Sequence, residues 1–478
     1  MLNRLFQNRT IEFGLLFIIV LASRIPFLWA GFGAEEDSWL LAITTENIAL
    51  NGTYEMSRAP GHPLQEIIYS WMYDGGLSAF ATNMLSAIGS AIAALFFALS
   101  MKNLGFKHYL FAAYTFAFTP IVFISSTYTI DYMPAMAFVM MSFYFITSHF
   151  SSLRGINAIV LSGFFLGIAI GFRLTSGIML IPFCILLLPF SNGGLKKILI
   201  LSFVTAIIGL LTYIPVLKTY GFSFFTYSDQ FPYPNFPKLF YKATVGVFGT
   251  IGLLIIIIYK MKILLLKKFI IKDFIPEDIP KKIYYASLTA ILLYLISYLR
   301  LPQKSAYLIP IIPFIILLFG YFLSNRAFKI FCVLLTTSSF FFSVNLTDSL
   351  RGSSYSSLSM KFTIAGQEIF VDPLTGPVFS DYTKRLNKIA FTEKIYQKTR
   401  IQQTKIVLIC GWWYNQLLVR NWDCEMNQNV ILVFYIDKSA MEKYISEGYE
   451  IYYLPEQNIY NNQYSQINCT DSLAKPYF

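Results

Sequence analysis

Three adjacent acids, Glu35, Glu36 and Asp37, follow the first hydrophobic run of the chain in the stretch AGFGAEEDSWLL. Neighbouring carboxylates repel one another, and a charge is costly to hold at the edge of a hydrocarbon layer. One interpretation is structural, with Asp37 capping a helix and the two glutamates complementing its positive end. Since one cap suffices, three acids favour a working site, in which a carboxylate serves as a general base.

Other segments carry side chains that are suited to binding an anion or to orienting a base. They are the rigid turn SRAPGHPLQE, the loop SSTYTIDYMP, the stretch GFRLTSG and the proline-rich stretch RLPQKSAYLIPIIPF. Arginine and lysine in such places are able to clamp a phosphate as its charge grows. The candidates in these segments are Arg58, His62, Asp131, Arg173, Arg300, Lys304 and Tyr307.

Each candidate also has a simpler interpretation. Asp131 stands directly before a hydrophobic run and is able to cap it. Arg173 has the position of an interfacial arginine that extends its side chain to water. The residues of 300–307 have the composition of ordinary interface anchors. The placement of all these residues on one face of the protein is the stronger argument for a site.

The composition indicates that membrane helices position these residues. The chain has 478 residues, of which 56% are hydrophobic, 18% aromatic and only 13% charged, whereas soluble domains carry about 25% charged residues. The net charge of +11 is explained by basic cytoplasmic loops rather than by nucleic acid as a partner. With three histidines in all, the sequence excludes a histidine-based metal cluster.

Eleven apolar stretches have bilayer-spanning length, about 17–25 residues each. The stretch 156–190 is interrupted by Gly171, Arg173 and Gly177, so a broken helix is an alternative there. The predicted spans are 11–29, 79–100, 108–126, 133–150, 156–171, 174–190, 197–217, 241–259, 283–300, 306–323 and 328–345.

The distribution of basic residues predicts the orientation of the chain in the membrane. With the N-terminus in the cytoplasm, the cytoplasmic segments hold sixteen Lys and Arg, against eight on the other side up to the last span. This orientation places the candidates, a long first loop at 30–78 and everything after about 346 on the outer face. Within the loop, residues 38–50 predict an interfacial helix that ends at Asn51-Gly52, with Trp39 turned inward.

The last part of the chain, residues 346–478, changes character. EIFVDP, KIVLIC, VILVFYI and YEIYYLP have strand composition and alternate with the helix-like TKRLNKIAFTEKIYQKT and SAMEKYISEG. Strands that alternate with helices predict a small α/β domain. The expected organisation is thus a transmembrane domain over 1–345 and an extracytoplasmic α/β domain over 346–478.

The first loop resembles the corresponding segment of the polytopic glycosyltransferases of the GT-C superfamily, which include protein O-mannosyltransferases and the aminoarabinose transferases of lipid A. Those proteins carry an acidic pair after the first span, then an aromatic residue, a Gly-aromatic turn and an HP motif. The matching residues are Glu36-Asp37, Trp39, Gly52 with Tyr54, and His62-Pro63. The resemblance covers the first 140 residues, reaches KSAYLIPIIPF loosely, and hardly extends to the C-terminal domain.

The resemblance implies an all-α polytopic membrane protein with a GT-C-like fold, located in the plasma (inner) membrane. It implies transfer of a sugar from a polyprenyl-phosphate donor to a glycan, lipid or protein hydroxyl, with inversion. Asp37, or next Glu36, is the expected base, and Asp131 orients an arginine or the substrate. No metal is expected; Mg²⁺ or Mn²⁺ between Asp37 and Asp131 is the alternative.

Two other classes of function fit parts of the sequence. One is a transporter or flippase of lipid-linked sugars, although transporters hold their charged sites near the bilayer midplane rather than at one face. The other is a non-catalytic membrane scaffold whose C-terminal domain binds a partner. Convergence of Asp37 and Asp131 in space favours the enzyme.

Overall fold

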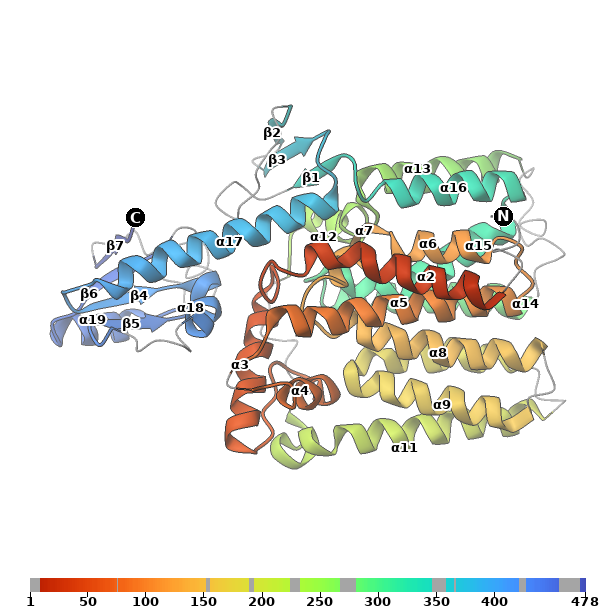
Figure 1. Cartoon of the computed structure of the whole chain (residues 1–478), viewed down its shortest axis with the longest axis horizontal. Coiled ribbons are helices and arrows are strands. Elements are labelled where there is room, and N and C mark those ends of the chain that lie inside the picture. The colour runs from red at the N-terminus through yellow and green to blue at the C-terminus, as the bar shows by residue number, and fades with distance from the viewer. Residues whose placement is uncertain are drawn as a thin grey trace.

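A computed structural model of the chain describes residues 9–74, 76–151, 155–188, 193–223, 233–266, 281–345, 358–364, 367–420, 427–454 and 473–478. Most described helices lie side by side in a bundle (Figure 1). At one end of it lie α3 (Glu36–Asn51) and α4 (Pro63–Ser70). From this same end α17 (Pro377–Arg400) leads to a separate sheet (Figure 1).

Within the described residues, six helical segments are long and apolar enough to cross a membrane. The multi-span helical architecture is therefore as predicted, but the count of eleven is not confirmed. The six are α5 (Ala79–Asn103), α9 (Gly155–Phe172), α11 (Gly194–Tyr220), Val245–Leu265 of α13 (Val245–Leu266), α14 (Lys281–Arg300), and Ser305–Phe322, which joins η6 (Ser305–Ile311) to α15 (Ile312–Phe322). Shorter apolar helical segments are Tyr132–Ser148 of α8 (Tyr132–Ser151) and Leu174–Leu186, which joins η2 (Leu174–Met179) to α10 (Leu180–Leu186).

Several predicted spans are broken or shortened. The stretch 108–126 divides into α6 (Tyr109–Ala117) and α7 (Pro120–Ser125), because Pro120 lacks the N–H that a continuous helix needs. The first run is a helix, α2, only over Arg9–Arg24, and a 3₁₀ turn, η1 (Ile25–Phe27), follows it. The last predicted span ends early, since α16 covers Asn325–Thr337 and Ser343–Asn345 is a strand, β1.

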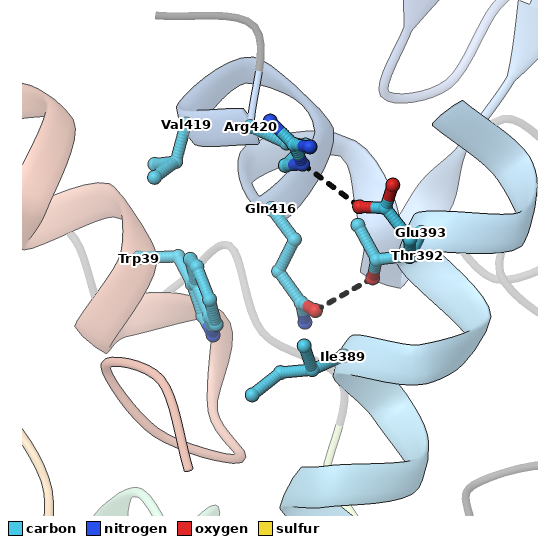
Figure 2. A pocket seen from close by; sticks show the side chains of 7 residues that line it. All are labelled: Trp39, Ile389, Thr392, Glu393, Gln416, Val419 and Arg420. Carbon is cyan, nitrogen blue, oxygen red and sulfur yellow. Dashed lines mark hydrogen bonds and ion pairs between the residues drawn. The ribbon is translucent and has the colours of Figure 1, made fainter. Parts of the chain in front are cut away.

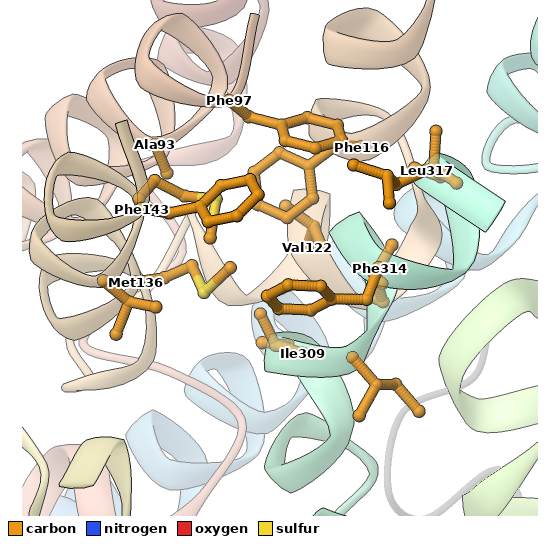
Figure 3. Close-up of a cluster of buried hydrophobic side chains, with 14 of the residues drawn as sticks. Ala93, Phe97, Phe116, Val122, Met136, Phe143, Ile309, Phe314 and Leu317 are labelled. Atoms are coloured by element: carbon orange, nitrogen blue, oxygen red, sulfur yellow. The ribbon is translucent and has the colours of Figure 1, made fainter. Parts of the chain in front are cut away.

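One continuous hydrophobic core joins the bundle. Figure 3 shows side chains of α5, α6, α8 and α15 meeting in it. Phe97 and Phe116 make an edge contact with ring centroids 5.7 Å apart, and Phe143 and Phe314 another at 5.5 Å. This core fixes the helix ends that carry the loops described below.

Small residues bring α9 and α11 close together. Gly163, Gly167 and Gly171 recur every four residues and so lie on one face of α9. A Cβ atom at Gly167 would lie 2.5 Å from the Cβ of Ile208, and one at Gly171 2.6 Å from the Cβ of Thr212. This spacing is the small-residue packing that lets membrane helices approach. It also fixes the end of α9, from which Arg173 follows.

The C-terminal region contains two small sheets. One is antiparallel, in the order β1-β3-β2, with β2 at Met360–Ile364 and β3 at Gln367–Asp372. The other is parallel, in the order β5-β4-β6-β7. It consists of β4 (Ile406–Ile409), β5 (Val430–Val433), β6 (Glu450–Tyr453) and β7 (Ala474–Pro476), with α18 (Tyr414–Arg420) and α19 (Lys438–Ser446) in the crossovers. The predicted α/β character is confirmed, and β1, β2, β7 and α18 are additions.

The α9–α11 contact predicts the effect of a larger side chain. Gly167→Leu forces the two helices apart and is expected to lower stability by about 1–3 kcal/mol. Gly14→Leu is the matched control, because a Cβ atom at Gly14 of α2 meets nothing within 4 Å. Thermal unfolding in detergent is expected to show a lower Tm for the first variant only. Equal Tm values would contradict the close packing.

Candidate active site

Helix α3 presents the three acids. It begins at Glu36 and ends at Gly52, whose φ of 66° is in the left-handed region that glycine favours, so the predicted helix and its stop are confirmed. Trp39 is turned inward, and its Nε1 donates to the carbonyl of Gly33 at 2.8 Å. The prediction that Asp37 caps this helix is wrong, although Glu36 and Asp37 do lie in its first turn. The N-cap is Glu35 rather than Asp37, and no side chain makes a capping hydrogen bond.

Glu35 and Asp37 share one cation, and Glu36 contacts another. Glu35 lies 2.5 Å from Lys304, which also pairs with Asp37. Glu36 accepts instead from two residues of the C-terminal region, from Lys388 at 3.3 Å and from Asn415 at 3.0 Å. The repulsion between the carboxylates is thus offset by two sets of partners, and Glu36 belongs to the contact with the C-terminal region.

Arg58 links the first loop to the start of α8. Its Nε lies 3.2 Å from the carboxylate of Asp37, and its Nη2 pairs with Asp131. Asp131, which is fully buried, pairs through its other oxygen with Arg173 at 2.6 Å. Nη1 of Arg58 is buried and has no hydrogen-bond partner among the described residues. An unpaired buried donor is unfavourable by itself and marks a place for an acceptor.

A buried glutamate holds the turn that carries Arg58. Glu66 accepts from the backbone N–H and the hydroxyl of Ser57 at 2.8 and 2.7 Å, from the N–H of His62 at 3.2 Å, and from the hydroxyl of Tyr54. Gly61 has a φ of 89°, and its carbonyl accepts from Tyr213 of α11 at 2.9 Å. Glu66 is not among the predicted site residues, although it is the last residue of the predicted turn SRAPGHPLQE.

His62 fastens this turn to the end of α9. Its Nδ1 lies 2.8 Å from the carbonyl oxygen of Phe172 and 3.5 Å from Asp131. Burial, reinforced by Arg58, lowers the pKa of His62 to about 4. The ring is therefore neutral at pH 7, with its proton on Nδ1, because a carbonyl oxygen only accepts. In the ligand-free site His62 acts as a positioning residue.

Two tyrosine rings lie against the guanidinium of Arg173. The guanidinium carbon of Arg173 lies 4.5 Å from the ring centroid of Tyr132 and 4.9 Å from that of Tyr307. Such cation–π contacts hold a guanidinium without using its N–H donors. Arg173 stands where α9 ends and η2 begins, so the predicted break in this region of the chain is present.

The structure brings most of the candidates together. Asp37, Arg58, His62, Asp131, Arg173, Lys304 and Tyr307 form one connected cluster, hereafter the acid–arginine cluster. Arg300 does not join it, because it is exposed at the end of α14 and makes no ion pair among the described residues. Glu36 also lies outside it, because its carboxylate contacts Lys388 and Asn415 instead.

Two neighbouring acids differ in proton affinity. Burial would raise the pKa of Asp37, but Lys304 and Arg58 lower it to about 2. Burial raises the pKa of Glu36 to about 7, against the opposing effect of Lys388. Burial also opposes ionisation of Asp131, yet the two guanidinium groups hold its pKa well below the ordinary value. Asp37 and Asp131 are thus anionic at neutral pH.

The described residues do not fit a divalent metal. They contain no group of three or more His, Cys, Asp or Glu side chains placed to hold an ion. Asp131 uses both carboxylate oxygens on arginines, and Asp37 is paired with Lys304 and Arg58. Mg²⁺ prefers several oxygen ligands in octahedral geometry, which two such occupied carboxylates do not supply.

Comparison with known proteins gives a limited result. No protein-family model matches the chain, and no curated protein is similar to it. Among solved structures, the chain is similar to ArnT from Cupriavidus metallidurans in the apo state and bound to undecaprenyl phosphate. Identity is 14% in both, with TM-scores of 0.48 and 0.47 over 65% and 66% of this chain and 60% of that one. It is also similar to the S. cerevisiae protein O-mannosyltransferase Pmt1–Pmt2 complex bound to the sugar donor, at 17% identity and a TM-score of 0.37, over 43% of this chain and 33% of that one.

The chain thus spans at most 60% of the length of these structures. Protein O-mannosyltransferases are among the enzymes that the first loop resembles. At such low identities and TM-scores, the function of this chain rests on its own site residues.

The raised pKa of Glu36 predicts a pH-dependent stability. Its folded pKa of about 7 exceeds the ordinary 4.5, so the folded state holds the proton more tightly. Its contribution is fully present below about pH 4.5 and is lost as the pH rises to about 7. The Tm of the wild type relative to Glu36→Gln is therefore expected to fall over this range and to level off above it. Parallel Tm curves from pH 5 to 8 would contradict the buried, proton-retaining Glu36.

Proposed function

We propose that the chain is a membrane glycosyltransferase that transfers a sugar from a polyprenyl-phosphate donor to an acceptor hydroxyl, with inversion. The observation that carries this proposal is the acid–arginine cluster. It joins two anionic carboxylates to three cations at one end of the helical bundle, and it includes a buried arginine N–H without a partner.

The cations supply the site for the donor phosphate. Nη1 of Arg58 is free to donate, and a guanidinium carries five N–H donors of which the carboxylates use only some. Arg173 pairs with Asp131 and Lys304 with Asp37, which are the two carboxylates that also hold Arg58. Charge-assisted hydrogen bonds from such groups stabilise a leaving phosphate as its negative charge grows.

The reaction needs one base and no strong acid. The acceptor oxygen forms a bond to the anomeric carbon of the sugar, and the bond from that carbon to the phosphate oxygen breaks. Its electron pair stays on the polyprenyl phosphate, and the hydroxyl proton passes to Asp37. A single displacement of this kind inverts the anomeric configuration.

Substrate binding adjusts the basicity of Asp37. In the ligand-free arrangement, Lys304 and Arg58 keep its pKa at about 2, which makes it a weak base. A bound phosphate that accepts from the same cations offsets their positive charge around Asp37. The pKa of the carboxyl then rises toward its ordinary value, so that the base becomes effective when the donor is in place.

The charge distribution supports an outward-facing site. The bias of basic residues favours an orientation with the N-terminus in the cytoplasm, and with the acid–arginine cluster and the C-terminal region on the opposite side of the plasma membrane. Asp37 and Asp131 share Arg58 as a partner, and their convergence favours an enzyme over a transporter. Arg300, exposed near this end, remains a candidate for contacting the lipid phosphate or the acceptor.

One prediction of the proposed function compares the two adjacent acids Glu36 and Asp37. Asp37→Asn is expected to reduce release of polyprenyl phosphate from a mixture of polyprenyl-phosphate sugars by about 10²–10⁴-fold, the usual contribution of a general base. Glu36→Gln is the matched control, because Glu36 contacts Lys388 and Asn415 rather than the cluster. It is expected to retain most of the release. Equal release by the wild type and Asp37→Asn would reject Asp37 as the base.

Another prediction of the proposed function is that the activity does not depend on a divalent metal ion. Since both carboxylates of the cluster are occupied by cations, catalysis is proposed to need no divalent ion. Treatment of the purified protein with EDTA is expected to leave the rate of polyprenyl phosphate release unchanged. A loss of activity that added Mg²⁺ or Mn²⁺ restores would show that the site rearranges to bind a metal.

A further inference from the structure

A pocket of about 160 Å³ lies between α3 and the C-terminal region, outside the acid–arginine cluster. Its lining comes from three helices, α3, α17 and α18 (Figure 2). The lining residues are Trp39, Ile389, Thr392, Glu393, Gln416, Val419 and Arg420. The proposed transfer step uses none of these side chains, although α3 carries both Trp39 and the proposed base Asp37.

The floor of the pocket combines an aromatic wall with an unpaired donor. Trp39 is 7% exposed and Gln416 only 1%. The hydroxyl of Thr392 lies 2.9 Å from Oε1 of Gln416 and 2.9 Å from the carbonyl oxygen of Lys388, and its single proton serves one of these two acceptors. Nε2 of Gln416 is left without a hydrogen-bond partner among the described residues. Figure 2 shows the amide on the side of Trp39 and Ile389, with its nitrogen turned away from Thr392.

The mouth of the pocket carries a balanced pair of charges. Nε of Arg420 donates to Glu393 at 2.8 Å, and the two side chains are 40% and 41% exposed. Because the two charges compensate each other, the mouth favours neither an anion nor a cation. Polar groups at the mouth suit a ligand that carries hydroxyls better than an apolar one.

We infer that this pocket binds one neutral sugar ring. An indole wall suits the C–H face of a pyranose, and the amide and the ion pair suit its hydroxyls. A cavity of about 150 Å³ holds benzene, and a pyranose is larger, so part of the sugar extends through the mouth between Glu393 and Arg420. Gln416 supplies the buried donor that a ring hydroxyl satisfies.

The pocket and the proposed base lie on different faces of α3. Trp39 and Asp37 are two residues apart, so their side chains point about 200° apart around the helix axis. The inference therefore concerns the binding of a sugar ring and does not depend on the proposed transfer step.

The test is ligand-observed NMR on the full chain in detergent. Saturation transfer is measured to methyl hexopyranosides of glucose, galactose, mannose and N-acetylglucosamine. Gln416→Met removes the unpaired donor at similar volume, and Val419→Phe fills the pocket. Gln403→Met, at an exposed position before β4, is the matched control. Thermal unfolding of each variant verifies that it is folded.

The wild type and Gln403→Met are expected to show transfer to at least one glycoside. Gln416→Met is expected to weaken binding about tenfold, as for one lost buried hydrogen bond, and Val419→Phe to abolish it. Absence of transfer in the wild type, or equal transfer in all variants, overturns the inference.

Asp37→Asn separates the two proposals. Sugar binding that persists in this variant while polyprenyl phosphate release is lost supports both. Sugar binding without release by the wild type leaves the pocket in place and rejects the transferase. Release without sugar binding rejects the pocket and keeps the transferase.

Discussion

The guanidinium of Arg58 is the interaction on which the site depends. It joins Asp37 of the first loop to Asp131, which lies 73 residues after Arg58 in the chain. Buried charges are tolerated only when each has its partners, and removal of one member leaves the others uncompensated. Glu66 holds the backbone of the Arg58 turn, while the glycine face of α9 sets the position of Arg173 against Asp131. The helical bundle thus serves to keep these charges in register.

The three adjacent acids are explained by the geometry of a helix. Consecutive residues point about 100° apart around the axis, so neighbours in sequence need not share surroundings. Glu36 meets Lys388 and Asn415, whereas Asp37 meets Lys304 and Arg58. The same placement gives one acid a raised pKa and its neighbour a lowered one. A cluster that is repulsive in the sequence becomes two separate sets of ion pairs in the structure.

The sequence predicted the elements that local patterns encode. The helical composition of 38–50 and its Asn51-Gly52 stop, the alternating strands and helices of the C-terminal region, and the break near Arg173 are all present. The predicted count of eleven spans is not confirmed, and hydrophobicity alone does not show where Pro120 divides a helix or where 343–345 pairs as a strand. Lys388 and Asn415 were also missed, because their contacts with Glu36 are made by the tertiary fold. Glu66 was missed as well, although its contacts lie within its own turn.

The contacts of the C-terminal region join the two ends of the chain. Asn415 donates to Glu36 across 379 residues, and Arg385 of α17 is buried with its guanidinium on the carbonyl and hydroxyl of Thr127. The predicted boundary at 345–346 therefore marks a change of composition, and side chains of the two parts contact each other. Because a chain is synthesised from its N-terminus, the first loop is translated long before Lys388 and Asn415. Helix α3 is thus made early in biosynthesis, yet it reaches its final surroundings only after nearly the whole protein has been translated.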